Sequence, residues 1–323
     1  MDIQTRNNER ILNDLGDYGD AEFNVRRESL LVRNVLEEQI DTIDSHVALI
    51  REDTNQVLSI VGSKYRPVTH QEAFKTAEDV IMRSDLNLEG IDRHTAVSHN
   101  GARAYSTWTL PEHRVTLRKD DDVALQISAR NSYDGSWSFV VEVGGYRFIC
   151  LNMQVFANNF AIHKSKHTQG LNLDRIASRL SDAIMFYDQE TELWREMVDT
   201  KIDNYNAFDV LAHLANSKVA SSMLKNMVDD PDYRRLNAPI DILYEPDVVR
   251  NKTLKSLYHQ WLLERKQLGT TGWALYNAMT NWATHAVPTK RTSLGNVASI
   301  RVDRLEKVRK ILNNKMLPML LNS

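Results

Sequence analysis

The chain has 323 residues, 42% hydrophobic and 26% charged, which is typical of a globular protein with a substantial core. Its formal net charge of −3 excludes the strongly basic class of nucleic-acid-binding proteins, although a local basic groove remains compatible with it. The single cysteine, Cys150, excludes an internal disulfide, and no apolar run reaches the roughly 18 residues that a membrane helix needs. Residues 1–20 are too polar for a signal peptide, so we expect a cytoplasmic protein.

The charges are unevenly distributed along the chain. Residues 1–60 hold six Arg and thirteen Asp or Glu, a net charge of −7. Residues 286–323 hold eight Lys or Arg and two acids, a net charge of +6. This asymmetry predicts either separate acidic and basic partner surfaces or head-to-tail contacts between subunits.

The first 55 residues are predicted to form an N-terminal arm and a helix. Residues 1–20 are polar and contain two glycines, which indicates an arm or a frayed helix. From Glu28 to Ile50 the apolar residues recur at helical spacing, with acids on the opposite face. They are Leu31, Val35, Leu36, Ile40, Ile43 and Val47. We expect this helix to pack on the core or to contact a partner.

Residues 56–200 are predicted to form an α+β core domain. A strand within Gln56–Val68 leads to a helix that starts at the capping box Thr69–Glu72 and runs to Arg83, followed by a loop over 85–92. Alternating segments then predict an antiparallel β-meander. Its strands are Ala104–Leu110, ended by Pro111, then Val123–Ala129, Trp137–Val143 and Tyr146–Leu151, with turns at Asp134-Gly135 and Gly144-Gly145.

A long helix over Asn172–Val198 has an apolar stripe and is expected to back the sheet. The polar connector over 158–170 shows no obvious regular structure. From residue 201 to 323 the pattern predicts an all-helical C-terminal domain. Its expected helices are Ala207–Val228, Pro246–Gln267, Thr271–His285 and Val297–Asn314.

No catalytic or cofactor motif is apparent in the sequence. It contains neither a GxGxxG nor a GxxxxGK[ST] motif, and we expect no cofactor. His163 and His167 have the spacing of a helical metal site, but Lys164 and Lys166 lie between them and would repel a metal ion. The acids Asp120–Asp122 could bind a divalent ion, although a solvated turn is the simpler interpretation.

The mixture of cations and aromatic rings along the meander suggests a nucleic-acid interface. Single strands are bound by cations along the phosphates and by aromatic platforms under the bases. The candidate residues are Lys64, Arg66, Arg103, Trp108, Arg114, Arg118, Arg130, Tyr133, Lys164, Lys166 and His167. In the alternative interpretation, which composition alone favours, Trp108 and Trp137 belong to the core and the cations form a solvated face.

Three segments stand out by their sequence, order and spacing. They are GSKYRPVTHQEAF (Gly62–Phe74), RVTLRKDDDVALQISARNSYDGSWSFVVEVGGYRFICLN (Arg114–Asn152) and GWALYNAMTNWATH (Gly272–His285). They resemble a phage- and plasmid-type family known only as a domain of unknown function. That family has no assigned catalytic residues, so the resemblance implies none here.

The order of elements in the middle of the chain also resembles the core of the single-strand annealing proteins, which include the phage annealing recombinases and the eukaryotic Rad-type annealing protein. This resemblance implies rings or filaments and a basic groove beside the sheet that holds one strand. Arg114, Arg118, Lys164, Lys166 and Arg175 would line the groove.

Three functions therefore stand as hypotheses. The first is an oligomeric, ATP-independent protein of a phage or mobile element that binds and anneals single-stranded DNA. The second is a metal-dependent enzyme acting on nucleic acid through Asp120–Asp122. The third is an interaction protein that binds a host factor through the acidic segment Glu28–Ile50.

Overall fold

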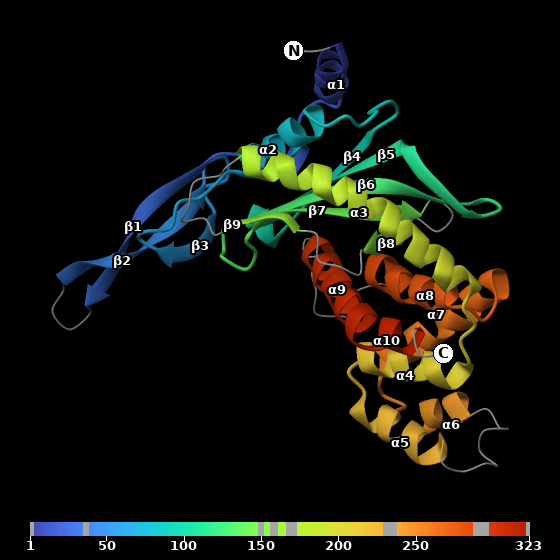
Figure 1. Ribbon diagram of the computed structural model, residues 1–323. Coiled ribbons are helices and arrows are strands. Elements are labelled where there is room, and N and C mark those ends of the chain that lie inside the picture. The colour runs from blue at the N-terminus through green and yellow to red at the C-terminus, as the bar shows by residue number, and fades with distance from the viewer. Residues whose placement is uncertain are drawn as a thin grey trace.

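The computed structural model describes residues 3–34, 39–147, 152–155, 161–165, 173–228, 238–286 and 297–320. The fold is α+β, as predicted. A three-stranded sheet projects from the body, a six-stranded antiparallel sheet forms the centre, and a group of helices lies below it (Figure 1). We call the projecting sheet the arm and the central sheet the main sheet.

The arm consists of β1 (Val25–Asn34), β2 (Gln39–Arg51) and β3 (Val57–Gly62), all antiparallel. The helix predicted over Glu28–Ile50 is therefore wrong. Its apolar positions fit helical spacing, but many are β-branched residues, which favour strands. β2 forms backbone hydrogen bonds with both β1 and β3. The periodicity of a single segment does not show such pairing between segments. The strand predicted within Gln56–Val68 is confirmed as β3.

The main sheet has the strand order β4-β5-β6-β7-β8, and β9 also pairs with β7. The strands are β4 (Asp92–Ser98), β5 (Arg103–Arg118), β6 (Asp121–Ser132), β7 (Phe139–Arg147), β8 (Asn152–Val155) and β9 (Ala161–Ser165). The predicted antiparallel meander is thus confirmed. The connector over 158–170 was expected to be irregular, but it contains β9, and β4 was not predicted.

Two predicted strand ends are wrong. Pro111 does not end β5, because it lies where the pairing with β6 shifts register between Leu110 and Arg114. Proline has no backbone N–H to donate, and at such an irregularity no hydrogen bond between the strands is lost. Gly144 and Gly145 do not form a turn either. They lie inside β7, opposite residues of both β6 and β8, so the fourth strand expected from Tyr146 begins as a continuation of β7.

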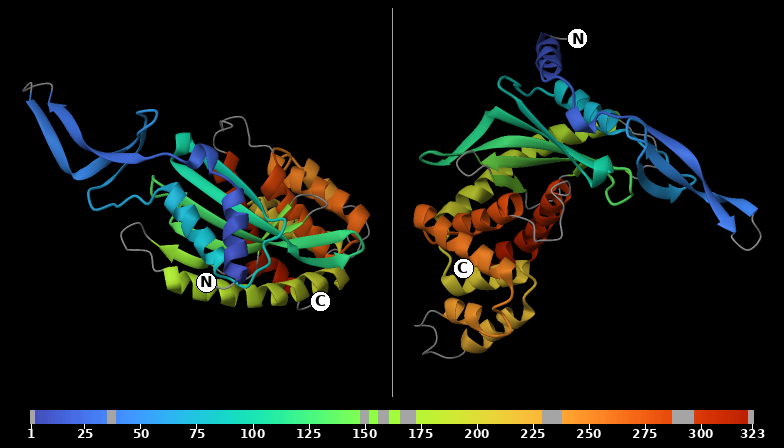
Figure 2. Two further views of the ribbon diagram at one scale, coloured as in Figure 1. Left: turned by 90° about the horizontal axis from the view of Figure 1, so that it is seen from above. Right: turned by 180° about the vertical axis from the view of Figure 1, so that it is seen from behind.

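Helices cover one face of the main sheet. These are α2 (His70–Met82) and the long α3 (Leu173–Asp199), which crosses the strands (Figure 1, Figure 2). The predicted capping box is confirmed: the Thr69 side chain accepts from the Glu72 N–H, and the Glu72 carboxylate accepts from the Thr69 N–H. The N-terminal helix α1 (Ile3–Asp14) packs on α2.

The helical region contains α4 (Asn204–Leu214), α5 (Lys218–Val228), α6 (Ala238–Tyr244), α7 (Lys252–Leu268), α8 (Gly272–His285), α9 (Val297–Ile311) and α10 (Leu317–Leu320). The single helix expected over 207–228 is two helices, separated where Asn216 adopts a φ of 53°. In the described part of the chain, no helix combines the length and the apolar character required to cross a membrane.

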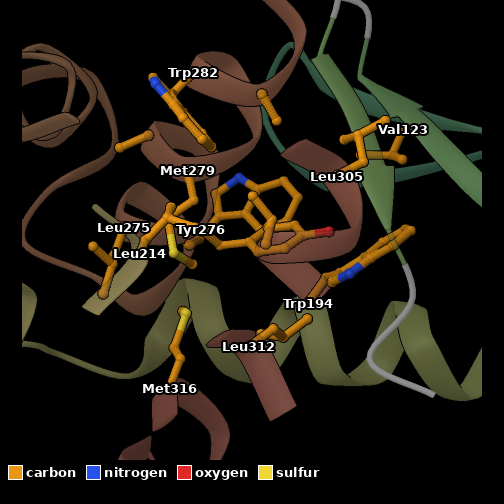
Figure 3. Packing of buried hydrophobic residues seen from close by; sticks show 14 of the residues in the cluster. Val123, Trp194, Leu214, Leu275, Tyr276, Met279, Trp282, Leu305, Leu312 and Met316 are labelled. Carbon is orange, nitrogen blue, oxygen red and sulfur yellow. The ribbon is translucent and has the colours of Figure 1, made fainter. Parts of the chain in front are cut away.

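The hydrophobic core is continuous from the main sheet into the helical region. Figure 3 shows Val123 of β6, Trp194 of α3 and Tyr276 of α8 in one cluster with Leu312 and other side chains. A second, smaller cluster, Phe23, Leu49, Val61 and Tyr133, fixes the base of the arm to the body.

Candidate functional site

The two faces of the main sheet differ because side chains alternate along each strand. One face carries apolar residues such as Trp108 and its neighbour Ile127, and it packs on α2 and α3. The opposite face carries polar residues, including Thr107, Ser128 and Arg130. Helix α9 packs against strands β4 and β5 on this polar face.

Five charged side chains form a cluster between the polar face and α9. Arg130 and Glu142 come from β6 and β7, and Arg301, Glu306 and Arg309 come from α9. Arg130 Nη2 lies 2.8 Å from Glu306 Oε1 and 3.3 Å from Glu142 Oε1. Arg309 Nη1 lies 3.2 Å and 3.5 Å from the same two oxygens. Three guanidinium groups thus face two carboxylates, and this α9 cluster has a formal charge of +1.

The contacts of Arg130 and Glu306 determine whether these two side chains are charged. Burial acts to lower the pKa of Arg130, but the carboxylates of Glu142 and Glu306 outweigh it and raise that pKa. Burial likewise acts to raise the pKa of Glu306, and the hydrogen bond from Arg130 together with the charge of Arg309 lowers it. Arg130 and Glu306 are therefore both charged at neutral pH.

The hydrogen bonding of Arg301 in this cluster is incomplete. Its Nε is buried and has no hydrogen-bond partner. The side chain lines a pocket of about 50 Å³ between the polar face and α9, together with Arg130 and Ser128. A buried donor without an acceptor costs roughly 1–3 kcal/mol, more when it is charged. An anionic oxygen in this pocket would supply the missing acceptor.

The positive charge of this site continues along α9. Lys307 and Lys310 are exposed on the helix. Arg304 Nη1 donates to the backbone oxygens of Trp282 and Ala286, which attaches α9 to the end of α8. The charge of Lys310 contributes to the lowered pKa of Glu306, so positive charge continues from the pocket onto the exposed side of α9.

The predicted aromatic platforms lie inside the protein. Trp108 is fully buried, and its indole N–H donates to Glu78 Oε1 at 2.9 Å. Tyr133 is fully buried, and its hydroxyl accepts from the backbone N–H of His70 at 3.1 Å. Trp137 is also buried. Trp108 and Tyr133 are therefore core residues, and the prediction that they form an open stacking surface is wrong.

The predicted cations whose side chains the structure describes do not converge on one surface. Arg130 belongs to the α9 cluster, whereas Arg103 is paired with Asp134 at 2.6 Å. The remaining described side chains are exposed at separate places: Lys64 and Arg66 follow β3, and Arg114 and Arg118 lie in the C-terminal half of β5. Arg118 Nη1 also donates to the backbone oxygen of Leu268.

Four predicted residues lie in β9, α3 and the segment between them. Lys164 is in β9, opposite Val140, which in turn lies opposite Arg130. Arg175 is in α3, but its side chain is outside the described part, and Lys166 and His167 lie outside the described residues altogether. The register thus places Lys164 and Arg130 level with each other on strands that flank β7.

Neither of the two possible metal sites, Asp120–Asp122 and the pair His163 and His167, has the arrangement that the sequence suggested. Asp121 is buried in an ion pair with Arg147 and accepts from the indole N–H of Trp273 at 2.9 Å. His163 lies in a strand, which removes the helical spacing expected toward His167. Over the described ranges, no three His, Cys, Asp or Glu side chains form a group able to hold a metal ion. Cys150 lies outside these ranges.

Asp209, His213 and Ser221 lie together beside α4 and α5, and this trio invites comparison with a hydrolase triad. Ser221 Oγ is 3.3 Å from His213 Nδ1, and Asp209 Oδ1 is 3.3 Å from the same nitrogen. A triad requires the acid and the nucleophile on different ring nitrogens, so that a proton can pass through the imidazole. The trio therefore lacks that arrangement.

Sequence reasoning missed Glu142, Arg301, Glu306 and Arg309. The only signal for the three α9 residues was the net charge of +6 over residues 286–323. No local motif connects this segment with Arg130, because Arg130 and Glu306 are 176 positions apart.

The family model for a domain of unknown function (DUF932) matches residues 57–307. The chain therefore belongs to this family, and the match includes the main sheet and α9 as far as Lys307. Comparisons with curated proteins and with solved structures give no match.

Proposed function

We propose that this protein binds single-stranded DNA and anneals complementary strands without ATP, as a homo-oligomer in the cytoplasm of a cell that carries a phage or other mobile element. The observation that carries this proposal is the incompletely bonded guanidinium of Arg301, in a pocket with net positive charge. Exposed lysines of the same helix, Lys307 and Lys310, add positive charge on its solvent side.

The buried rings suggest how the strand would be held. Because Trp108 and Tyr133 lie inside the core, we expect the strand to be held through its phosphates and not by these two rings. Phosphate contacts are sequence-independent and leave the base edges free to pair. A second strand could then pair with a strand held in this way, so annealing would need no nucleotide hydrolysis.

The order of the elements also supports the proposal. A meander of β5, β6 and β7 is backed by the long α3, which is the arrangement that the resemblance to single-strand annealing proteins implies. The alternative of a metal-dependent enzyme has less support, because Asp121 is already paired with Arg147.

Fluorescence anisotropy with a labelled single-stranded oligonucleotide tests the proposal. We expect binding at low salt, with an affinity that falls steeply as salt is added. The combined variant Arg301→Ala, Lys307→Ala and Lys310→Ala should weaken binding to all sequences alike. It should also reduce the salt slope by about 0.7 for each phosphate that the protein no longer neutralises.

A matched control removes three exposed cations that lie outside α9: Arg250→Ala, Lys252→Ala and Lys266→Ala. It changes the net charge equally and should retain most of the affinity. Absence of binding at low salt would overturn the proposal. An equal loss in both variants would show that only the overall charge matters, and would remove α9 as the site.

A further inference from the structure

A polar pocket lies where α4 ends and α5 begins. Its volume of about 340 Å³ suits a small molecule. Of the described residues that line it, three are basic, three carry hydroxyl groups and none is acidic. The bases are His213, Lys218 and Lys225, and the hydroxyls belong to Ser217, Ser221 and Ser222. Figure 1 shows α5 at the end of the helical region that points away from the main sheet, so this α5 pocket is separate from the α9 cluster.

A tight turn and one helical face bring these side chains together. Asn216, just after α4, has a φ of 53°, and the Ser217 N–H donates to the backbone oxygen of Ala212 at 2.8 Å. This bond closes the end of α4 and turns the chain into α5. Within α5, side chains three or four positions apart share a face of the helix. Four lining residues are related in this way: Lys218, Ser221, Ser222 and Lys225.

The first turn of α5 concentrates positive charge. The N–H groups at the start of a helix carry a positive partial charge, which favours acidic side chains or bound anions there. The first turn of α5 contains no acid, and the helix begins with Lys218. This lysine therefore adds a full charge to the positive end of the helix, and Lys225 adds another on the same face. A bound anion would offset the repulsion between these charges.

Ser221 supplies a nearly enclosed donor to the same pocket. It is 8% exposed, and its Oγ lies 3.3 Å from His213 Nδ1. That nitrogen carries a hydrogen, because it lies 2.8 Å from the backbone oxygen of Asp209, which can only accept. The Ser221 hydroxyl cannot donate to a protonated nitrogen, so its own hydrogen requires another acceptor. An anionic oxygen in the α5 pocket would provide it.

The nearby carboxylate of Asp209 does not oppose an anion strongly. Its Oδ2 lies 2.6 Å from Lys315 Nζ, so its charge is balanced by a lysine from outside the pocket. Its Oδ1 lies 3.3 Å from His213 Nδ1 and stabilises the imidazole in its present orientation. His213 can therefore turn its second ring nitrogen, Nε2, toward a ligand.

We infer that the α5 pocket binds a phosphate group that carries at most one ester bond. Such a group has a charge of about −1.5 to −2 at neutral pH, which matches the formal charge of +2 on Lys218 and Lys225. Its terminal oxygens can accept from the lysines and from the Ser221 hydroxyl. An internal phosphodiester has a single charge and two substituents, so it matches the pocket less well. The site lies outside α9 and does not depend on the proposed DNA binding.

The imidazole signal of His213 provides a test that reports on this pocket alone. Inorganic phosphate is titrated into the protein with isotopically labelled histidine, at fixed pH and fixed ionic strength, and the signal is assigned by its loss in His213→Gln. The wild-type signal should shift and saturate. Lys218→Ala with Lys225→Ala should weaken the phosphate affinity by about tenfold or more, because each lysine loses a charged hydrogen bond.

The matched control is Lys252→Ala with Lys266→Ala. It removes an exposed lysine from the first turn and another from the last turn of α7, outside the pocket, and should retain the wild-type affinity. All four lysines are exposed, so unchanged far-UV circular dichroism will show that both variants fold. No saturable shift with phosphate, or an equal loss in both variants, would overturn the inference.

Further titrations identify the source of the phosphate group. Deoxyadenosine monophosphate should shift the His213 signal, and deoxyadenosine should not. A shift with an oligonucleotide phosphorylated at its end, but not with the same oligonucleotide lacking that phosphate, would indicate the end of a strand instead of a small molecule. An equal shift with both oligonucleotides would overturn the preference for a phosphate with at most one ester bond.

The variant with Arg301→Ala, Lys307→Ala and Lys310→Ala should leave the phosphate titration of His213 unchanged. A failure of DNA binding through α9 and a failure of the α5 pocket are therefore distinguishable.

Discussion

Arg147 of β7 and Asp121 of β6 form a two-point ion pair in which Nη2 lies 2.8 Å from Oδ2 and Nε donates to Oδ1. Arg147 is 1% exposed and Asp121 is 2% exposed. The pair also contacts α8, because Trp273 donates to Asp121 and Arg147 Nη1 donates to Asn277 Oδ1 at 3.2 Å. The main sheet and the helical region are thus joined through one buried charged junction.

Removing one partner of this junction should be strongly destabilising. Arg147→Met leaves Asp121 buried without its counter-ion, which we expect to lower the free energy of unfolding by about 3–5 kcal/mol. Urea denaturation measures the change. Arg195→Met is the control, because the Arg195–Glu192 pair lies on the surface of α3 and should contribute less than about 1 kcal/mol. Equal effects at the two positions would contradict the assigned role of the junction.

Glu264 of α7 should make stability depend on pH. Burial raises its pKa, against the hydrogen bond from Gln260 and the charge of Arg147. The folded protein therefore holds this proton more tightly than the unfolded chain does. The stability it contributes is present below the ordinary carboxyl pKa and is lost as the pH rises through the raised value.

Glu264→Gln should consequently gain stability relative to wild type as the pH rises from about 4 to about 8. Urea denaturation at the two pH values measures this difference, with Glu196→Gln on the exposed surface of α3 as the control. A difference between Glu264→Gln and wild type that stays constant with pH would show that burial does not govern this carboxyl group.

Substitution of the buried rings should separate stability from binding. Trp108→Phe loses the hydrogen bond to Glu78 and some packing, at a cost of about 1–3 kcal/mol, and Tyr133→Phe leaves the buried His70 N–H without its acceptor, at a similar cost. Anisotropy should show unchanged oligonucleotide affinity for both folded variants. A stacking residue would instead lose about 1–3 kcal/mol of binding free energy, so such a loss would restore the platform hypothesis.

Gly101 should be intolerant of a side chain. Its φ is +94°, and a Cβ atom there would lie 2.8 Å from Phe23 Cζ and 2.9 Å from Arg51 Nη1. Gly101→Ala should therefore cost more than the roughly 1–3 kcal/mol of backbone strain alone. Gly135 has a φ of +72° with nothing within 4 Å, so Gly135→Ala carries the strain without the clash. Thermal denaturation of both variants should rank Gly101→Ala as the less stable.

Local chemistry made several elements predictable from the sequence. The capping box at Thr69 satisfies backbone donors within one helical turn, so it needs no tertiary context. The turn at Gly135 is similar, because a positive φ is a property of a single residue. Segment 28–50 was misread because its apolar residues recur at helical spacing, whereas the pairing of β1 with β2 and of β2 with β3 makes it two strands.

The candidate site was less predictable because distant residues build it. Arg130 was identified from its place in the meander, but its partner Glu306 comes from a helix near the other end of the chain. Trp108 and Tyr133 looked available because alternation shows which side chains share a face, but not which face another helix covers. That depends on Phe74 of α2, whose ring lies 6.4 Å from that of Trp108.

The hydroxyls of Ser98 and Ser299 lie 2.6 Å apart although 201 positions separate them in the chain. A ribosome adds about 5–20 residues per second, so β4 is synthesised about 10–40 s before α9. Helix α2 precedes the main sheet in the chain, and α3 follows it directly. The nascent chain thus covers the aggregation-prone side of the sheet first, and its polar side stays hydrated until translation is nearly complete.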